Sequence, residues 1–171
     1  MTNEIEVDPD ATFQFCVSGQ TQPSFKVSVA VSEWLVGNLE ALKDDNNKTI
    51  FNKVSNGFNQ NKLKTFSGHP TCDVYINSID YDTDFDYCQP VNVNTIVLFY
   101  FKGANNKSYM KACELHDFIM QEFITNDSWR SLTVKDKQIV QDTVITNSQL
   151  MMQPIQKNWG VMGAFELSHK L

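Results

Sequence analysis

Four aspartates alternate with other residues in a short stretch near the middle of the chain, at Asp80, Asp82, Asp84 and Asp86. Calcium favours alternating carboxylates in a flexible turn, so this stretch is a candidate cation loop. An EF-hand loop needs Gly at its sixth position and Glu at its twelfth, where this sequence has Phe85 and Val91. A solvated hairpin tip is therefore the better interpretation, and we expect neither a metal ion nor a cofactor.

Two histidines and two cysteines form a second candidate site, made of His69, Cys72, Cys88 and His116. Two thiolates and two imidazoles are a common ligand set for zinc. However, the spacing is irregular, and His116 falls in the apolar stripe of a predicted helix. We therefore expect a buried histidine bonded to the backbone. With no CxxC pair, we expect reduced packing residues at all four cysteines, Cys16, Cys72, Cys88 and Cys113.

Catalytic motifs are absent from the sequence. It has no GxSxG elbow, no Walker loop and no GxGxxG fingerprint. Glu166, Asp142 and Asp136 lie on predicted late strands and could form paired acids, but alternating polar strand positions are usually the solvent-facing side. We expect that the protein is not an enzyme.

Composition limits the other classes of function. A chain of 171 residues, 42% of them hydrophobic, predicts one domain spanning residues 1–171. No apolar run approaches the ~20 residues of a membrane span, and the acidic start Met1–Asp10 is unlike a secretory signal. We therefore expect a soluble protein of the cytosol. A net charge of −6 argues against binding to nucleic-acid phosphates.

The N-terminal third mixes weak and strong signals. Residues 1–31 form a polar leader with a possible β-hairpin, whose strands are Thr12–Val17 and Phe25–Val31. Ser32 is a candidate N-cap for a helix over Glu33–Lys43, because apolar residues recur on one face there. Residues 44–70 are rich in Asn and predict a long loop, with one short helix around Phe51–Phe58.

The middle of the chain predicts two strands and a helix. In Cys72–Tyr81 the apolar positions change phase by one residue, which is typical of a β-bulge. Val91–Lys102 is apolar on both faces in its second half, so it belongs in the interior of a sheet. After Ser108, apolar residues recur at three- and four-residue steps through Phe123, which predicts an amphipathic helix.

The C-terminal segment predicts three strands, Gln138–Thr146, Leu150–Gln156 and Trp159–His169, with turns at Asn147–Ser148 and Lys157–Asn158. The whole pattern predicts an α+β fold, in which two helices cover one face of a mostly antiparallel sheet. Met151 and Met152 point to opposite faces, as do successive residues of Val91–Lys102. We expect the second face to be covered by the N-terminal hairpin or by another subunit.

From about Thr71 to Leu171 the chain resembles the tail terminator, or tail completion, proteins of long-tailed viruses. The resemblance lies in the order of elements and in three segments, VNVNTIVLFYFKG (Val91–Gly103), SYMKACELHDFIMQEF (Ser108–Phe123) and QPIQKNWGVMGAFELSHKL (Gln153–Leu171). Family members tend to be shorter, and the possible hairpin and the Asn-rich loop are additions in this chain.

The resemblance implies a virion protein that forms a homo-oligomeric ring, with six copies expected. Such a ring caps the tail tube protein, joins it to the head connector and lets DNA pass without specific binding. We expect subunit contacts at Trp159, Val161, Phe165, Met151 and Met152. The aspartates Asp80, Asp82, Asp84 and Asp86 are expected to line the lumen, where negative charge repels DNA.

Three other functions remain open. The protein could be a stand-alone regulatory module that binds a protein or a small ligand, and a monomer with a deep pocket would favour that function. It could be another neck or connector protein of similar fold. A small metal-dependent hydrolase using the aspartates of residues 80–86 is the third, and it requires stoichiometric metal.

Overall fold

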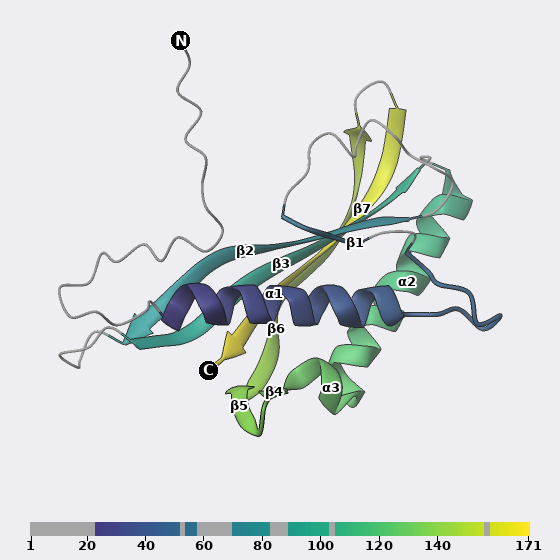
Figure 1. The fold of residues 1–171 in the computed structure, drawn as a ribbon. Helices are drawn as coiled ribbons and strands as arrows, with labels where there is room; N and C mark the ends of the chain where they lie inside the picture. Colours follow the sequence, from purple (N-terminus) through teal and green to yellow (C-terminus); the bar gives the residue numbers. More distant parts are fainter. Residues whose placement is uncertain (1–22, 52–53, 58–69, 83–88, 103–104, 156–157) are drawn as a thin grey trace, which may run out of the picture.

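The structure is a computed structural model that describes residues 23–51, 54–57, 70–82, 89–102, 105–155 and 158–171. Five strands form its main sheet in the order β1–β2–β3–β7–β6 (Figure 1). Their bounds are Val54–Asn56 for β1, Thr71–Asp82 for β2, Gln89–Lys102 for β3, Asp142–Ile155 for β6 and Asn158–Lys170 for β7. β1 pairs with β2 in parallel and every other pairing is antiparallel. The predicted α+β class is confirmed.

Helices α1 (Pro23–Ala41) and α2 (Asn106–Thr125) pack on the same face of this sheet (Figure 1). α1 lies against β1, β2 and β3, whereas α2 lies mainly against β7 and β6. A short helix, α3 (Asp127–Arg130), follows α2 and leads to a small hairpin of β4 (Leu132–Val134) and β5 (Lys137–Val140). The prediction of two helices on one sheet face is therefore confirmed for the long helices.

The N-terminal predictions need correction. Phe25–Val31, predicted as a hairpin strand, belongs to α1, and Thr12–Val17 lies outside the described residues. Val31, Leu35 and Leu39 are fully buried at four-residue spacing, and this helical period outweighs the β-branched residues that favour a strand. Ser32 is not a cap but a buried residue within the helix, where its hydroxyl donates to the Asn56 side chain.

The Asn-rich segment contains a strand rather than the predicted short helix. Val54–Asn56 forms β1, with Val54 opposite Cys72 and Asn56 opposite Val74. Phe51 and Val54 are both buried, so the core selects an extended chain here. Phe58 lies outside the described residues.

Strands β2 and β3 agree with the sequence. The predicted bulge in β2 is confirmed by a register shift between Ile76 and Ser78 against β3. β3 lies in the sheet interior, between β2 and β7. The α2 helix begins earlier than predicted, because Asn105 rather than Ser108 is its N-cap, and the Asn105 Oδ1 accepts a hydrogen bond from the Ser108 amide at 2.8 Å.

The predicted turn at Asn147–Ser148 is wrong. β6 runs without a break from Asp142 to Ile155, and a register shift between Ile145 and Asn147 absorbs the irregularity. Both polar residues sit on a strand at the edge of the sheet, where a polar side chain is tolerated and does not mark a turn. β6 and β7 remain paired as far as Ile155 and Asn158. Of the predicted turn at Lys157–Asn158, Asn158 belongs to β7 and Lys157 lies outside the described residues.

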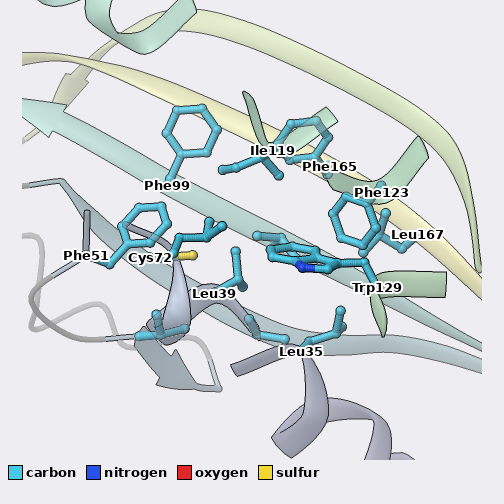
Figure 2. Close-up of a cluster of buried hydrophobic side chains, with 14 of the residues drawn as sticks. Leu35, Leu39, Phe51, Cys72, Phe99, Ile119, Phe123, Trp129, Phe165 and Leu167 are labelled. Atoms are coloured by element: carbon cyan, nitrogen blue, oxygen red, sulfur yellow. The ribbon is translucent and has the colours of Figure 1, made fainter. Parts of the chain in front are cut away.

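The core lies between the helices and the sheet (Figure 2). Phe99 from β3 and Phe165 from β7 are fully buried, with ring centroids 6.2 Å apart. Gly163 lies directly opposite Phe99 in the strand pairing, and a Cβ at that position would overlap the Phe99 ring. The glycine therefore provides the space that the aromatic ring fills.

The second sheet face carries a smaller apolar cluster than the face under the helices. Leu98, Tyr100 and Ala164 are buried within one chain, and Tyr75, Ile96 and Met162 are partly buried against them. The strand register also places polar residues such as Asp73, Gln149 and Asn147 on this face. Cover by the N-terminal hairpin or by another subunit stays a prediction, because residues 1–22 lie outside the described residues.

Candidate functional site

Two of the four aspartates of the candidate cation loop lie within the described residues. Asp80 and Asp82 lie at the end of β2, and the Asp80 carboxylate accepts a hydrogen bond from Asn94 Nδ2 at 2.9 Å. Asp84 and Asp86 lie outside the described residues. Within residues 70–82 and the other described ranges, no group of three His, Cys, Asp or Glu residues could hold a metal ion.

The predicted zinc ligands have separate roles where they are described. Cys72 is fully buried and pairs with Phe99 across β2 and β3. The His116 ring on α2 stacks on Phe165, with ring centroids 4.6 Å apart and planes 17° from parallel. His69 and Cys88 lie outside the described residues. His116 is largely buried, as expected, but in the described part of the chain its Nε2 has no hydrogen-bond partner.

The three acids considered for catalysis are not brought together. Asp142 pairs with Arg130, whose Nη2 donates to Oδ1 at 2.9 Å and whose Nε donates to the same oxygen at 3.1 Å. Glu166 accepts from Asn147 Nδ2 at 3.2 Å, and Asp136 lies in the exposed β4–β5 turn. These partners are structural, so the acids offer no shared reactive site.

A buried polar network around His169 was missed in the sequence. His169 has no exposed surface; Thr95 Oγ1 lies 2.7 Å from its Nε2 and Thr143 Oγ1 lies 2.9 Å from its Nδ1. Since the Thr143 hydroxyl donates to the Arg130 carbonyl oxygen, Nδ1 must be the protonated nitrogen. Thr95 then donates to Nε2, and burial lowers the pKa of His169 to about 4.

This network fixes structure rather than chemistry. The ring of Trp34 lies edge-on to His169, with centroids 5.8 Å apart, and the Trp34 indole donates to the Ser128 carbonyl oxygen at 2.9 Å. The neutral imidazole thereby joins β3, β7, β6 and α1. The alternation of His169 with Leu167 and Phe165 on one strand face was the available signal.

A groove lies between α2 and the sheet edge formed by β6, and we call it the α2–β6 groove. It is an open surface groove of about 650 Å³, lined by Met120, Phe123, Ile124, Arg130 and residues 142–148. Ile124 and Val144 are 59% and 55% exposed, which is unusual for large apolar side chains. The Arg130–Asp142 ion pair lies among these lining residues. The arrangement therefore suits a ligand with an apolar surface and no large net charge.

The α2 side of this groove continues as a stripe along the helix. Residues at four- and three-residue steps share this flank, namely Tyr109, Cys113, His116, Met120 and Ile124. The two ends of this flank, Tyr109 and Ile124, are 40% and 59% exposed, whereas His116 in its middle is largely buried against Phe165 and Met120 packs against the core. Only the ends of the flank are therefore widely accessible.

The β6 side of the groove is an open strand edge. In the described part of the chain β7 is the one strand that pairs with β6, so β6 is an edge strand of the main sheet. The stretch Asn147–Gln153 (NSQLMMQ) contains no charged residue and no proline. Charges and prolines are the usual protection of edge strands against pairing with another chain. The stretch Asn147–Gln153 therefore has neither charges nor prolines to protect it. The β-bulge between Ile145 and Asn147, at its start, adds some local twist.

The predicted subunit contacts divide into three groups. Val161 and Phe165 are fully buried in the chain's own core, so their prediction as contact residues is wrong. Met152 is 46% exposed on the helix-facing side of β6, and Met151 is partly buried on the other side. The backbone of Trp159 pairs with Pro154. Only the β6 methionines remain as accessible members of the predicted set whose side chains are described.

Known proteins add nothing to this geometry. No protein-family model and no curated protein sequence matches the chain. Among the described residues, no helix combines the length and apolar character that crossing a membrane requires. Function must therefore be argued from the α2–β6 groove and from the resemblance in sequence pattern.

Proposed function

We propose that this protein is a virion structural subunit, a tail terminator that forms a ring on the tail tube and joins it to the head connector. Its chemistry is assembly rather than catalysis. The observation that carries the proposal is the β6 edge of the sheet. Its stretch Asn147–Gln153 has no charged residue and no proline, and the strand lies beside the α2–β6 groove, where Ile124 and Val144 are exposed.

An edge of this kind supports self-association. Exposed apolar surface at Ile124, Val144 and Met152 is concentrated on β6 and the adjoining end of α2. The opposite edge of the sheet is the short strand β1, which α1 covers. A ring requires the β6 edge to meet a different surface of the next copy, because repeated head-to-tail contacts close into a ring whereas β6-to-β6 pairing gives a symmetric dimer.

The order of elements also supports the terminator function. The resemblance depends on an N-terminal helix, a strand pair, a helix across the sheet and a closing three-stranded meander. α1, β2–β3 and α2 follow that order. The main sheet then closes with the pair β6–β7, because β4 and β5 form a separate two-stranded sheet. The net charge of −6 suits a ring through which DNA passes. In this proposal Asp80 and Asp82, at the end of β2, lie towards the lumen.

Mass and shape test the proposal together. Light scattering of the purified chain, whose mass is 19.5 kDa, should report a closed oligomer near six copies, and electron microscopy should image rings. Added to a polymerising tail tube protein, the rings should stop growth at one end. A protein that stays monomeric at high micromolar concentration would contradict the proposal.

A stand-alone binding module is the second candidate, since the α2–β6 groove lies within the usual range of ligand-site volumes, roughly 300–1,000 Å³. In that case the groove binds an apolar ligand while the protein remains monomeric. The light-scattering measurement separates the two functions, because only the module predicts a monomer.

A further inference from the structure

We infer that Asn56–Gly57 is a site of self-modification, at which Asn56 converts to aspartate or isoaspartate when β1 separates from its neighbours. These two residues are the one Asn–Gly pair in the sequence, and they lie at the end of β1. Three features of the described structure support the site: the exposure of Asn56, the open space around Gly57, and two hydrogen bonds that hold both residues in place. This chemistry does not depend on the proposed assembly function.

The reaction needs only these two residues and water. The Gly57 backbone nitrogen loses its proton to hydroxide and attacks Cγ of Asn56, which forms a C–N bond and closes a succinimide ring. The bond between Cγ and Nδ2 breaks, and Nδ2 leaves as ammonia. Water then opens the ring at either of its carbonyl groups, which gives aspartate or isoaspartate at position 56. Because ammonia is lost, the conversion is irreversible.

The glycine makes Asn56 the asparagine that is best placed for this reaction. A side chain on the residue after an asparagine hinders attack by its backbone nitrogen, and glycine has no Cβ. The surroundings of Gly57 are also open, since an added Cβ would meet nothing within 4 Å. Asn56 is exposed, so that water reaches its side chain. The local sequence and the local space therefore both favour ring closure.

Two hydrogen bonds oppose the reaction while β1 is in place. The Gly57 amide donates to the Val74 carbonyl oxygen at 2.7 Å, so the nitrogen that must attack is engaged and its proton is held. The Ser32 hydroxyl on α1 donates to Oδ1 of Asn56, which directs the side chain at the helix instead of at Gly57. Ring closure therefore requires both bonds to open, and β1 protects the site as long as it stays paired with β2.

β1 is an element that can open without loss of the core. It is three residues long and lies at the edge of the main sheet, beside β2. Short elements with few contacts open locally at a lower free energy than the strands in the middle of a sheet. Modified chains should therefore accumulate from folded protein, as a chemical record of how often β1 has opened.

The two products have different effects on this edge. Aspartate keeps an oxygen that accepts from the Ser32 hydroxyl, so β1 can pair again. Isoaspartate routes the backbone through the former side chain, which adds a methylene group before Gly57. The added group moves the Gly57 amide away from the Val74 carbonyl oxygen. The isoaspartate form should therefore leave the edge of β2 less well covered.

Peptide mapping by mass spectrometry tests the site in the full chain, incubated at mildly alkaline pH. Conversion at position 56 should be roughly tenfold or more faster in urea-unfolded protein than in folded protein, because neither hydrogen bond survives unfolding. Equal rates in the two states would overturn the protection by β1. Absence of conversion at position 56 in the unfolded chain would overturn the site itself.

A matched pair of serine variants tests the contact with α1. Ser32→Ala removes the hydrogen bond to Asn56, and conversion in the folded protein should become about fivefold faster. Ser131→Ala is the control, because the Ser131 hydroxyl donates to the Asp127 carbonyl oxygen on α3, away from β1. An equal rate in the two variants would overturn the role of Ser32.

A second asparagine in the same chain separates local from global opening. Asn147 precedes Ser148 on β6, so its conversion reports opening at the other edge of the sheet. In Ser32→Ala, conversion at Asn147 should stay at the wild-type rate while conversion at Asn56 rises. A rise of the same size at both asparagines would mean that the whole chain unfolds, and would overturn the local control by β1.

Discussion

The two edges of the sheet are built differently. At one edge, β1 is three residues long and packed under α1, and the Ser32 hydroxyl on the helix donates to Asn56 on the strand. At the other edge, β6 is fourteen residues long, and β7 is the one described strand that pairs with it. An edge that is short and covered discourages further pairing, whereas a long edge with an uncharged stretch such as Asn147–Gln153 favours it. The difference indicates where this protein meets other chains.

Substitutions in the interior of the sheet should destabilise the protein most. Gly163→Ala puts a methyl group into the Phe99 ring, which is itself packed against Phe101 and Phe165, so we expect a loss of about 3 kcal/mol in the free energy of unfolding. The matched control is Gly37→Ala on α1, where nothing lies within 4 Å; it should stabilise by about 0.5–1 kcal/mol. Urea denaturation of both variants measures the difference, and equal effects would refute the close packing at Gly163.

Substitutions on the β6 edge should weaken self-association and leave the free energy of unfolding nearly unchanged. Val144→Lys places a charge on β6, where Val144 is 55% exposed, and we expect at least a tenfold loss of self-association with little change in unfolding free energy. Val134→Lys is the control, because Val134 is an exposed valine on β4, away from the groove. Sedimentation equilibrium measures both. Equal behaviour of the two variants would place the contact elsewhere.

The sequence predicted some of the elements that make up the sheet and missed others. The apolar run of β3 and the stripe of α2 are strong periodic signals, and both predicted their elements. β1 was missed because three residues carry too little pattern, and its strand conformation depends on burial of Phe51 and Val54 against distant residues. The error at Asn147–Ser148 arose because polar residues mark turns as often as they mark an edge.

The candidate site was harder to predict than the fold. Met152 was selected from its place on a predicted strand, whereas Val161 and Phe165 were selected without knowing which face the helices cover. The α2–β6 groove joins residues from helix and strand that are about 20 positions apart, and periodicity within one element cannot reveal such a contact. The His169 network was missed for the same reason, since its two threonines come from different strands.

Low pH should lower the free energy of unfolding, because His169 is buried as a neutral ring in the core between the two edges. The pKa of His169 is about 4 when folded and close to 6.5 when unfolded, so the unfolded chain binds the extra proton as pH falls below 6.5. The stability from the neutral ring is thus complete above pH 6.5 and declines until pH 4, by up to about 3 kcal/mol.

Comparison of wild type with His169→Gln across this window isolates the histidine, because only wild type should carry this slope in unfolding free energy. Titration by NMR should also find one imidazole that stays neutral below pH 5. A normal titration near pH 6.5 for His169 would contradict the network.

The smallest loss of unfolding free energy is expected for the Arg130–Asp142 ion pair, which lines the α2–β6 groove. The Arg130 and Asp142 side chains are 44% and 41% exposed, and ion pairs at this exposure contribute little because water screens them. Asp142→Asn should therefore lower the unfolding free energy by less than about 1 kcal/mol, as measured by thermal denaturation. A larger loss would mean that this ion pair is part of the core.

Hydrogen exchange tests the contrast between edges most directly. Amides of Asn147–Gln153 should become strongly protected when the protein assembles, compared with the same protein diluted until it is monomeric, while amides of Val54–Asn56 should exchange alike in both states. Protection that rises at β1 and not at β6 would contradict the assignment of β6 as the joining edge.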